Sequence, residues 1–287
     1  MIRYAKPKTL DEALALLAEA PWKILAGGTD FYPALGSRPL ADNVLDINAI
    51  EELAGFSETP THLVIGARTN WTEIARHALP SSFDALRQAA VEVGSAQIQN
   101  VATIAGNLCN ASPAADGVPA LLILDAEVEL RAAGGGRRIL PLAGFIHGNR
   151  RTALQPGEMV TAIRIPKTTH EGASSFVKLG ARRYLVISIA MAAARVVMDE
   201  SGKIAKASIA VGSCSAVAQR LGTLEASLAG LGTADEIAKA VEAAALDELN
   251  PIDDVRASAD YRRMAAREIV LRALRGALGI NETGIAA

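Results

Sequence analysis

A predicted buried strand runs directly into a glycine turn in the stretch Trp22-Lys23-Ile24-Leu25-Ala26-Gly27-Gly28-Thr29-Asp30-Phe31. Paired glycines after a strand let successive backbone N–H groups approach an anion, because no Cβ blocks the approach. Thr29 and Asp30 add side chains that can hydrogen-bond to a sugar or a pyrophosphate. A tight turn without a ligand is the alternative interpretation of Gly27 and Gly28. The G-x-G-x-x-G fingerprint and the P-loop are both absent from the sequence, so a nucleotide here is expected to be held in another manner.

A second candidate segment of small residues begins at Asn100. It contains the stretch Ala102-Thr103-Ile104-Ala105-Gly106-Asn107, which is predicted as a loop that places a glycine among short hydrogen-bonding side chains. Further on, Ser112 and Pro113 predict a helix N-cap and first helical position, with Asp116 in or near the first turn. A helix start presents unpaired N–H groups to a bound anion. Alternatively, Ser112 and Asp116 serve only to cap the helix and to compensate its dipole, without binding a ligand.

Composition excludes several classes of protein. The 287 residues carry 29 Lys and Arg against 31 Asp and Glu, and only 4% are aromatic, so neither duplex nor single-stranded nucleic acid is an expected partner. Two cysteines without a C-x-x-C pattern exclude an iron–sulfur or structural zinc site within the chain, and the four histidines show no metal-binding spacing. No secretory signal and no membrane span are predicted. We therefore expect a soluble protein in the reduced cytoplasm.

Hydrophobic periodicity predicts an α+β protein of two domains, residues 1–170 and 171–287, with a polar linker near residues 167–172. Strands are predicted at residues 2–4, 22–25, 44–47, 63–65, 159–165, 175–179, 186–198 and 205–211, with a hairpin at 127–140. Helices are predicted from Thr9, which with Glu12 forms a capping box, and at residues 33–37, 71–78, 82–93, 118–124, 235–249 and 259–278. Ser258 is a predicted N-cap, Arg262 and Arg263 are placed on a solvated or partner-facing side, and residues 284–287 are expected to fray.

The two loops together carry a resemblance to a known family. The segments Ala26-Gly27-Gly28-Thr29-Asp30, Thr103-Ile104-Ala105-Gly106-Asn107 and Asn110-Ala111-Ser112-Pro113-Ala114-Ala115-Asp116 resemble the FAD-binding motifs of the flavoprotein, or medium, subunit of molybdenum hydroxylases. This family includes the xanthine dehydrogenases, carbon monoxide dehydrogenases and aldehyde oxidoreductases. The similarity extends to Lys178 and to the segment from Val255 to Arg263, so it covers the whole chain.

The resemblance implies a two-part FAD-binding fold of the vanillyl-alcohol-oxidase (PCMH) type, with parts at about residues 1–55 and 56–170. A smaller α+β domain with an antiparallel sheet and helices is implied to follow. The implied FAD contacts are Ile24, Leu25, Ala26, Gly27, Gly28, Thr29, Asp30, Phe31, Val93, Ala102, Thr103, Ile104, Ala105, Gly106, Asn107, Ser112, Asp116, Val160 and Lys178. Lys178 is expected near the N1–C2 carbonyl edge of the flavin, where a cation favours the anionic reduced form. A surface lysine on a strand is the alternative.

The function that the resemblance implies is electron transfer within a larger enzyme. FAD is expected to be the redox centre of this chain, with [2Fe–2S] clusters in a small partner subunit and molybdopterin in a large one. Electrons are expected to pass through FAD to NAD⁺, oxygen, a quinone or another carrier. We assign no catalytic residue and no metal ligand in this chain. A self-sufficient flavoprotein oxidoreductase and a non-catalytic binding protein on the same fold are the alternatives.

Two departures from the family pattern bear on these expectations. Ala105 stands where many relatives have a second glycine, so backbone approach to the flavin is expected to differ there. Tyr184-Leu185-Val186 follows Arg182-Arg183 where some relatives carry acidic residues, so no acceptor preference is carried over from those relatives. Cys109 is expected to pack beside the second loop and not to act as a reactive thiol.

Overall fold

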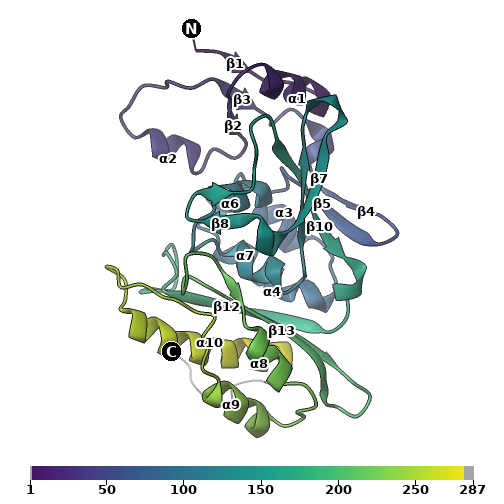
Figure 1. The fold of residues 1–287 in the computed structure, drawn as a ribbon, viewed down its shortest axis with the longest axis vertical. Coiled ribbons are helices and arrows are strands. Elements are labelled where there is room, and N and C mark those ends of the chain that lie inside the picture. The colour runs from purple at the N-terminus through teal and green to yellow at the C-terminus, as the bar shows by residue number, and fades with distance from the viewer. Residues whose placement is uncertain (1, 281–287) are drawn as a thin grey trace.

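The computed structural model describes residues 2–280, which form three tiers along the long axis of the molecule (Figure 1). The predicted fraying of residues 284–287 lies outside the described residues. The N-terminal tier holds a small parallel sheet, the middle tier a larger antiparallel sheet with helices, and the last tier a second antiparallel sheet covered by the C-terminal helices. This arrangement confirms the predicted α+β class.

The first tier is a three-stranded parallel sheet of order β1-β3-β2. Its elements are β1 (Tyr4–Ala5), α1 (Leu10–Glu19), β2 (Lys23–Leu25), α2 (Phe31–Leu35) and β3 (Val44–Asp46). Thr9 and Glu12 form the predicted capping box at the start of α1, and Leu10, Leu14 and Leu17 pack its apolar face into a local core. The prediction that β2 is buried is wrong, because β2 is an edge strand on which Lys23 and Ile24 are exposed.

The middle tier is a five-stranded antiparallel sheet of order β4-β5-β10-β6-β7. Its strands are β4 (Phe56–Glu58), β5 (His62–Gly66), β6 (Glu127–Arg131), β7 (Arg137–Pro141) and β10 (Met159–Pro166), and a short ribbon joins β8 (Ile146–Gly148) to β9 (Arg151–Thr152). The predicted hairpin is present as β6 and β7. Alternate residues such as Leu63, Ile65, Val128 and Ile163 point to one face and form the main core with the helices that cover it.

The covering helices are α3 (Trp71–Arg76), α4 (Asp84–Glu92), α5 (Ala96–Gln99), α6 (Ile104–Asn110) and α7 (Gly117–Leu122). Helix α6 replaces the predicted loop. Thr103 caps it, with its Oγ1 accepting from the Gly106 N–H at 3.1 Å. The sequence pattern does not predict this helix, because Gly106, Asn107 and Asn110 lower the helix propensity of a segment of only seven residues.

The last tier is a four-stranded antiparallel sheet of order β11-β12-β13-β14. Its elements are β11 (Ala173–Leu179), β12 (Ala190–Met198), β13 (Ile204–Gly212), β14 (Gln219–Arg220), α8 (Gly222–Ser227), α9 (Ala234–Ala243) and α10 (Ala259–Ala277). One face of the sheet packs on α10, whereas Phe176, Met191, Ala193 and Ala210 on the other face belong to the main core of the middle tier. The sheet is therefore shared between two layers of helices.

Two predictions in this tier are corrected. Strand β12 begins at Ala190 and not at Val186, because Arg182 donates to the carbonyls of Tyr184 at 3.0 Å and Leu185 at 2.6 Å and holds residues 182–185 in a turn. Arg262 is not solvated: it is 3% exposed and donates to the carbonyl oxygens of Ile189 and Ser213 and to Asp254. Ser258 caps α10 as predicted.

Candidate functional site

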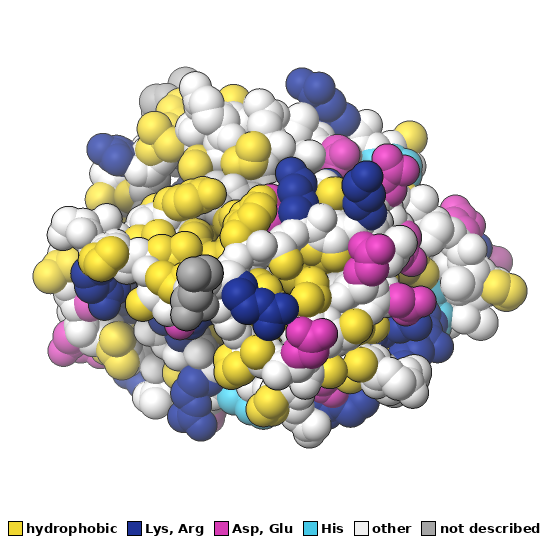
Figure 2. Space-filling view, turned by 90° about the horizontal axis from the view of Figure 1, so that it is seen from above, with side chains coloured by type: hydrophobic (Ala, Val, Ile, Leu, Met, Phe, Trp, Pro, Cys, Tyr) yellow, Lys and Arg dark blue, Asp and Glu magenta, His cyan; other side chains and the backbone are white. Residues whose placement is uncertain are grey.

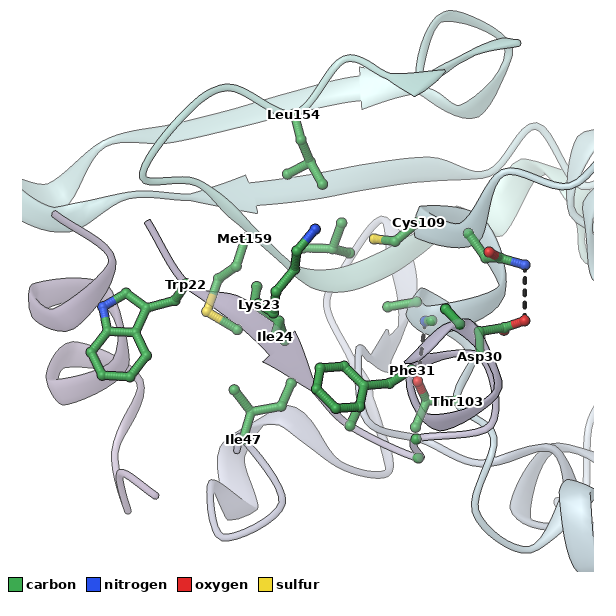
Figure 3. Close-up of a pocket in the computed structure, with 18 of the residues that line it drawn as sticks. Trp22, Lys23, Ile24, Asp30, Phe31, Ile47, Thr103, Cys109, Leu154 and Met159 are labelled. Atoms are coloured by element: carbon green, nitrogen blue, oxygen red, sulfur yellow. Dashed lines mark hydrogen bonds between the residues drawn. The ribbon is translucent and has the colours of Figure 1, made fainter. Parts of the chain in front are cut away.

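A cavity of about 1690 Å³ separates the first tier from α6 and β10. Figure 3 shows its walls: Trp22, Lys23 and Ile24 come from the first tier, Thr103 and Cys109 from α6 and its cap, Leu154 from the segment before β10, and Met159 from the start of β10. Both candidate segments of the sequence therefore face the same hollow. Such a volume exceeds that of most drug-sized sites and is suited to a long dinucleotide ligand.

The glycine turn is fixed by contact with another backbone segment. A Cβ on Gly27 would lie 2.0 Å from the Val101 carbonyl oxygen, so this glycine allows the turn to pack against the start of the second segment. Gly28 has φ of +73°, a left-handed conformation that favours glycine. Asp30 accepts a hydrogen bond from the Asn110 amide at 3.2 Å, which ties the turn to the end of α6 (Figure 3). The glycine pair therefore shapes the wall of the cavity.

Strand β2 presents free backbone groups to this cavity. Lys23 N–H donates to the Asn43 carbonyl, and residues of a parallel ladder alternate in the side to which their N–H and C=O point. Because β2 is the edge strand, the N–H and C=O of Ile24 point away from β3, and Ile24 lines the cavity. This edge can therefore hydrogen-bond to a ligand.

The second segment offers polar groups from α6. Ala102, Thr103 and Ala105 line the cavity although they are buried, and Gly106 is exposed at its surface. The Oδ1 atom of Asn107 is buried and has no hydrogen-bond partner among the described residues. An unpaired buried carbonyl of this kind costs free energy unless a ligand or water satisfies it.

The prediction that Ser112 caps a helix is wrong. Its hydroxyl accepts from the Ala114 N–H at 3.2 Å and so closes a turn, and α7 begins only at Gly117. The Pro113 carbonyl accepts from the Ser213 N–H at 2.9 Å. This bond ties the turn to the last tier. Ser112 still lines the cavity.

Asp116 and Lys178 form a buried ion pair behind the cavity wall. Their side chains are 10% and 8% exposed, and the Lys178 Nζ lies 2.9 Å from an Asp116 carboxylate oxygen. Ser188 donates to the other oxygen at 3.1 Å, and Lys178 also donates to the Glu92 carbonyl at 3.2 Å. Burial raises the pKa of Asp116, and Lys178 opposes that shift. The surface-lysine interpretation of Lys178 is therefore wrong.

The structure brings most of the predicted contacts together around this cavity. Leu25 and Ile104 are the exceptions in the two segments, since both side chains are buried in the core and line no part of it. Asp116 and Lys178 also lie outside its lining. The predicted residues that line the cavity are Ile24, Ala26, Gly27, Gly28, Thr29, Asp30, Phe31, Val93, Ala102, Thr103, Ala105, Gly106, Asn107, Ser112 and Val160.

Lys178 lines a second, smaller cavity of about 610 Å³, together with Gln88, Phe176, Arg182 and Arg183. Glu92 and Val186 line this cavity, whereas their chain neighbours Val93 and Ile187 line the larger one, so the two hollows share a wall.

Sequence reasoning missed several lining residues, among them Lys23, Trp71, Arg150 and Ile187. Trp71 is buried, and its indole N–H has no partner among the described residues. Of these four residues, only Lys23 had a signal in the sequence, because it lies in the predicted strand that runs into the glycine turn.

Within residues 2–280, no His, Cys, Asp and Glu side chains group as a metal site would require. No helix in that range has the length and apolar character needed to cross a membrane. Figure 2 looks down on the N-terminal end and shows Lys and Arg interspersed with Asp and Glu around a gathering of hydrophobic side chains. This face carries no continuous basic patch of the kind that binds nucleic acid.

Fold and cavity together define a flavoprotein of the oxidoreductase class, and comparison with known proteins gives the family. Residues 1–168 match the FAD binding domain in molybdopterin dehydrogenase, and residues 175–277 match the carbon monoxide dehydrogenase flavoprotein C-terminal domain. The chain belongs to this family of molybdenum hydroxylase flavoproteins. The resemblance of the loop motifs is thereby confirmed, and the family cofactor is FAD.

Relatives of this chain include subunits of dehydrogenases. The medium chain of carbon monoxide dehydrogenase from Hydrogenophaga pseudoflava is 30% identical over 279 residues, which cover 96% of each chain. The FAD subunit of nicotinate dehydrogenase from Eubacterium barkeri is 39% identical over 204 residues, covering 68% of this chain and 69% of the relative. A solved structure of the Hydrogenophaga enzyme superposes with a TM-score of 0.86 at 29% identity, over 98% of both chains.

The residues of the cavity fit FAD on observations of this structure. The volume is large enough for a dinucleotide, the β2 edge and Gly106 leave backbone groups accessible, and the Asn107 Oδ1 atom lacks a partner within the described chain. These features are what a bound flavin dinucleotide requires.

Proposed function

We propose that this chain is the FAD-carrying electron-transfer subunit of a multi-subunit molybdenum hydroxylase. The observation that carries the proposal is the large cavity on which both family motifs converge. In this proposal a small partner subunit holds [2Fe–2S] clusters, a large one holds molybdopterin, and an external acceptor takes the electrons from FAD. The acceptor is NAD⁺, oxygen, a quinone or another carrier, and the assembly works in the cytoplasm.

The division of labour among the residues follows from their positions. We infer that the turn Ile24 to Phe31 holds the pyrophosphate of FAD, and that Ala102 to Asn107, Ser112, Val93 and Val160 surround its ribityl and flavin part. Bound FAD supplies the chemistry that connects one-electron with two-electron transfer. The chain itself binds and orients the cofactor and excludes water from its buried wall.

Asp116 and Lys178 act together in this proposal. Because each neutralises the other, the pair offers the flavin region a fixed dipole and not a lone cation. The Lys178 ammonium also holds the Glu92 carbonyl, next to Val93 at the shared wall of the two cavities. The pair therefore fixes that wall whether or not it contacts FAD directly.

We divide the chain into an FAD-binding domain of residues 1–170, with parts at about 1–55 and 56–170, and a C-terminal domain of residues 171–287. Three observations support this division: the separate small core of the first tier, the separate sheets of the other two, and the family matches that meet between residues 168 and 175.

The absorption spectrum and the composition of the native complex test this function. The purified chain should be yellow or should take up added FAD, and the chain isolated from its own host should elute with iron and molybdenum. A colourless chain that takes up no FAD would contradict the proposal. Substrate turnover by the chain alone would favour the self-sufficient flavoprotein instead.

A further inference from the structure

Two of the carboxylates that line the large cavity are neutralised by neighbouring cations. Glu19 pairs with Arg3 at 3.2 Å, and Glu158 pairs with Arg138 at 2.7 Å. Asp30 is hydrogen-bonded to Asn110 at 3.2 Å. Glu19 and Glu158 are therefore ion-paired, whereas the neutral Asn110 amide does not compensate the charge of Asp30.

Three charged lining residues have no such partner among residues 2–280: Lys23, Asp42 and Arg150. The guanidinium of Arg38, by contrast, donates to the Ala34 carbonyl at 2.8 Å. Glu19 and Glu158 are paired with cations outside the lining. Among the other lining residues, three cations (Lys23, Arg38 and Arg150) stand against two anions (Asp30 and Asp42), which leaves an excess of one positive charge. FAD carries two negative charges on its diphosphate, which require compensation when they leave water.

The two cations stand on opposite walls of the cavity. Lys23 belongs to β2 of the first tier, and in Figure 3 its side chain extends into the cavity on the side where Cys109 and Leu154 are drawn. Arg150 follows β8 of the middle tier, and its backbone N–H donates to the Ala111 carbonyl at 3.1 Å, two residues beyond Cys109. The Lys23 side chain and the Arg150 backbone therefore both lie toward the C-terminal end of α6, and both residues line the cavity.

Short links along the chain and through hydrogen bonds connect the glycine turn to both cations. Lys23 precedes the turn on the same strand, and Ala111 follows Asn110, whose amide holds Asp30 at the far end of the turn. Arg150 has φ of +56°, an uncommon conformation for a side chain of this size, and the hydrogen bond to Ala111 maintains it. The fold thus fixes an arginine beside the turn at a cost in backbone strain.

We propose that Lys23 and Arg150 form a two-sided cationic clamp on the diphosphate of FAD. This inference deepens the proposed FAD site and depends on it. In this clamp the backbone N–H groups of the turn orient the diphosphate through hydrogen bonds. The two cations supply the positive charge that neutral backbone groups lack.

Titration of FAD into the flavin-free chain tests the clamp through the quenching of flavin fluorescence. Lys23→Gln and Arg150→Gln should each raise the Kd of FAD about five- to tenfold, and the double variant should raise it further. Between about 0.05 M and 0.5 M salt, the Kd of the natural chain should rise more steeply than that of the double variant. Lys8→Gln and Arg151→Gln are matched controls, because they remove exposed cations of the same tiers that do not line the cavity.

Far-UV circular dichroism and thermal unfolding of each flavin-free variant establish that its fold is intact. Kd values of both clamp variants within twofold of the natural chain, an equal loss in the controls, or an unchanged salt dependence would overturn the clamp. In each of these cases the natural chain still binds FAD and the proposed function stands. If the natural chain does not bind FAD at all, the proposed function fails first.

Discussion

At the scale of single residues, the glycine turn has a structural role within the protein that does not depend on a bound ligand. Gly27 allows the backbones of two segments far apart in sequence to touch, at Val101, and this contact aligns the walls of the cavity. Gly28 supplies the left-handed conformation that the chain needs to turn away from β2. The sequence pattern predicted an anion cradle, and the structure adds a packing reason for the first of the two glycines.

Gly27→Ala should therefore damage both stability and FAD retention. The new Cβ would overlap the Val101 carbonyl, so the two segments must separate, and overpacking of this kind costs about 2 kcal/mol. Urea unfolding of the flavin-free chain and the flavin content after gel filtration measure the two effects. Gly144→Ala is the control, since no atom lies within 4 Å of the position of its Cβ, and it should change neither quantity. Unchanged stability and flavin content in Gly27→Ala would contradict the packing role.

Lys178→Met tests the buried ion pair through pH. Removal of the ammonium leaves the Asp116 carboxylate in a buried site, which should cost about 3 kcal/mol of unfolding free energy near neutral pH. Burial already raises the pKa of Asp116 above its unfolded value, so the folded state takes up a proton more readily than the unfolded state. The deficit should therefore be largest at about pH 8 and shrink at about pH 5, as protonation removes the charge.

Urea unfolding at both pH values measures this change, on flavin-free protein so that cofactor binding does not contribute. The double variant Asp116→Asn and Lys178→Met removes both charges and should recover most of the loss near neutral pH. A deficit that is the same at both pH values would show that Lys178 acts through packing and not through Asp116.

At the scale of elements, helix α7 is held at both ends by the last tier. Its N-terminal Asp116 binds Lys178 and Ser188, and its C-terminal carbonyls at Leu122 and Ile123 accept hydrogen bonds from Arg220 at 2.9 Å and Arg195 at 3.1 Å. Arg195 is 1% exposed. Arg220 and Arg195 thus donate to carbonyls that the end of a helix leaves unpaired. A helix as short as α7 could not be stable alone.

Arg195→Met should lower the unfolding free energy by about 2 kcal/mol, because it leaves the buried carbonyl of Ile123 without a donor and removes a part-buried bond to the Glu171 carbonyl. Lys206→Met on the neighbouring strand β13 is the control, because Lys206 is exposed, and its effect should be small. Chemical unfolding followed by far-UV circular dichroism compares the two. A loss no greater than in the control would show that Arg195 does not support α7.

Elements with strong local signals could be predicted, and elements made by distant contacts could not. The capping box at Thr9 and Glu12, the β6–β7 hairpin and α10 follow from residues close in sequence. Periodicity places α7 within one residue of its start at Gly117, whereas the cap signal at Ser112 and Pro113 marks a turn that is bonded to Ser213, a hundred residues away. The motif residues could likewise be assigned to a site, whereas Arg150 could not, because its place in the cavity depends on a turn after β8.

At the scale of the whole molecule, the predicted domains differ in topology but share a core. Phe176, Met191, Ala193 and Ala210 from the last tier pack with the helices of the middle tier, and the opposite face of the same sheet packs on α10. Separation of the two domains would expose both sides of this contact. Apolar burial of this kind couples unfolding of one side to the other.

The chain should therefore unfold in one transition across the domain boundary, and its own residues provide separate probes of the two sides. Both tryptophans, Trp22 and Trp71, lie in the first 170 residues, so their fluorescence reports the FAD-binding side. Cys214 is fully buried in the C-terminal core, and the other cysteine, Cys109, is exposed, so in a Cys109→Ser background thiol labelling reports the C-terminal side alone. With increasing urea, tryptophan fluorescence and Cys214 labelling should change at the same midpoint. Labelling of Cys214 at a clearly lower urea concentration would show instead that the C-terminal domain opens independently of the FAD-binding domain.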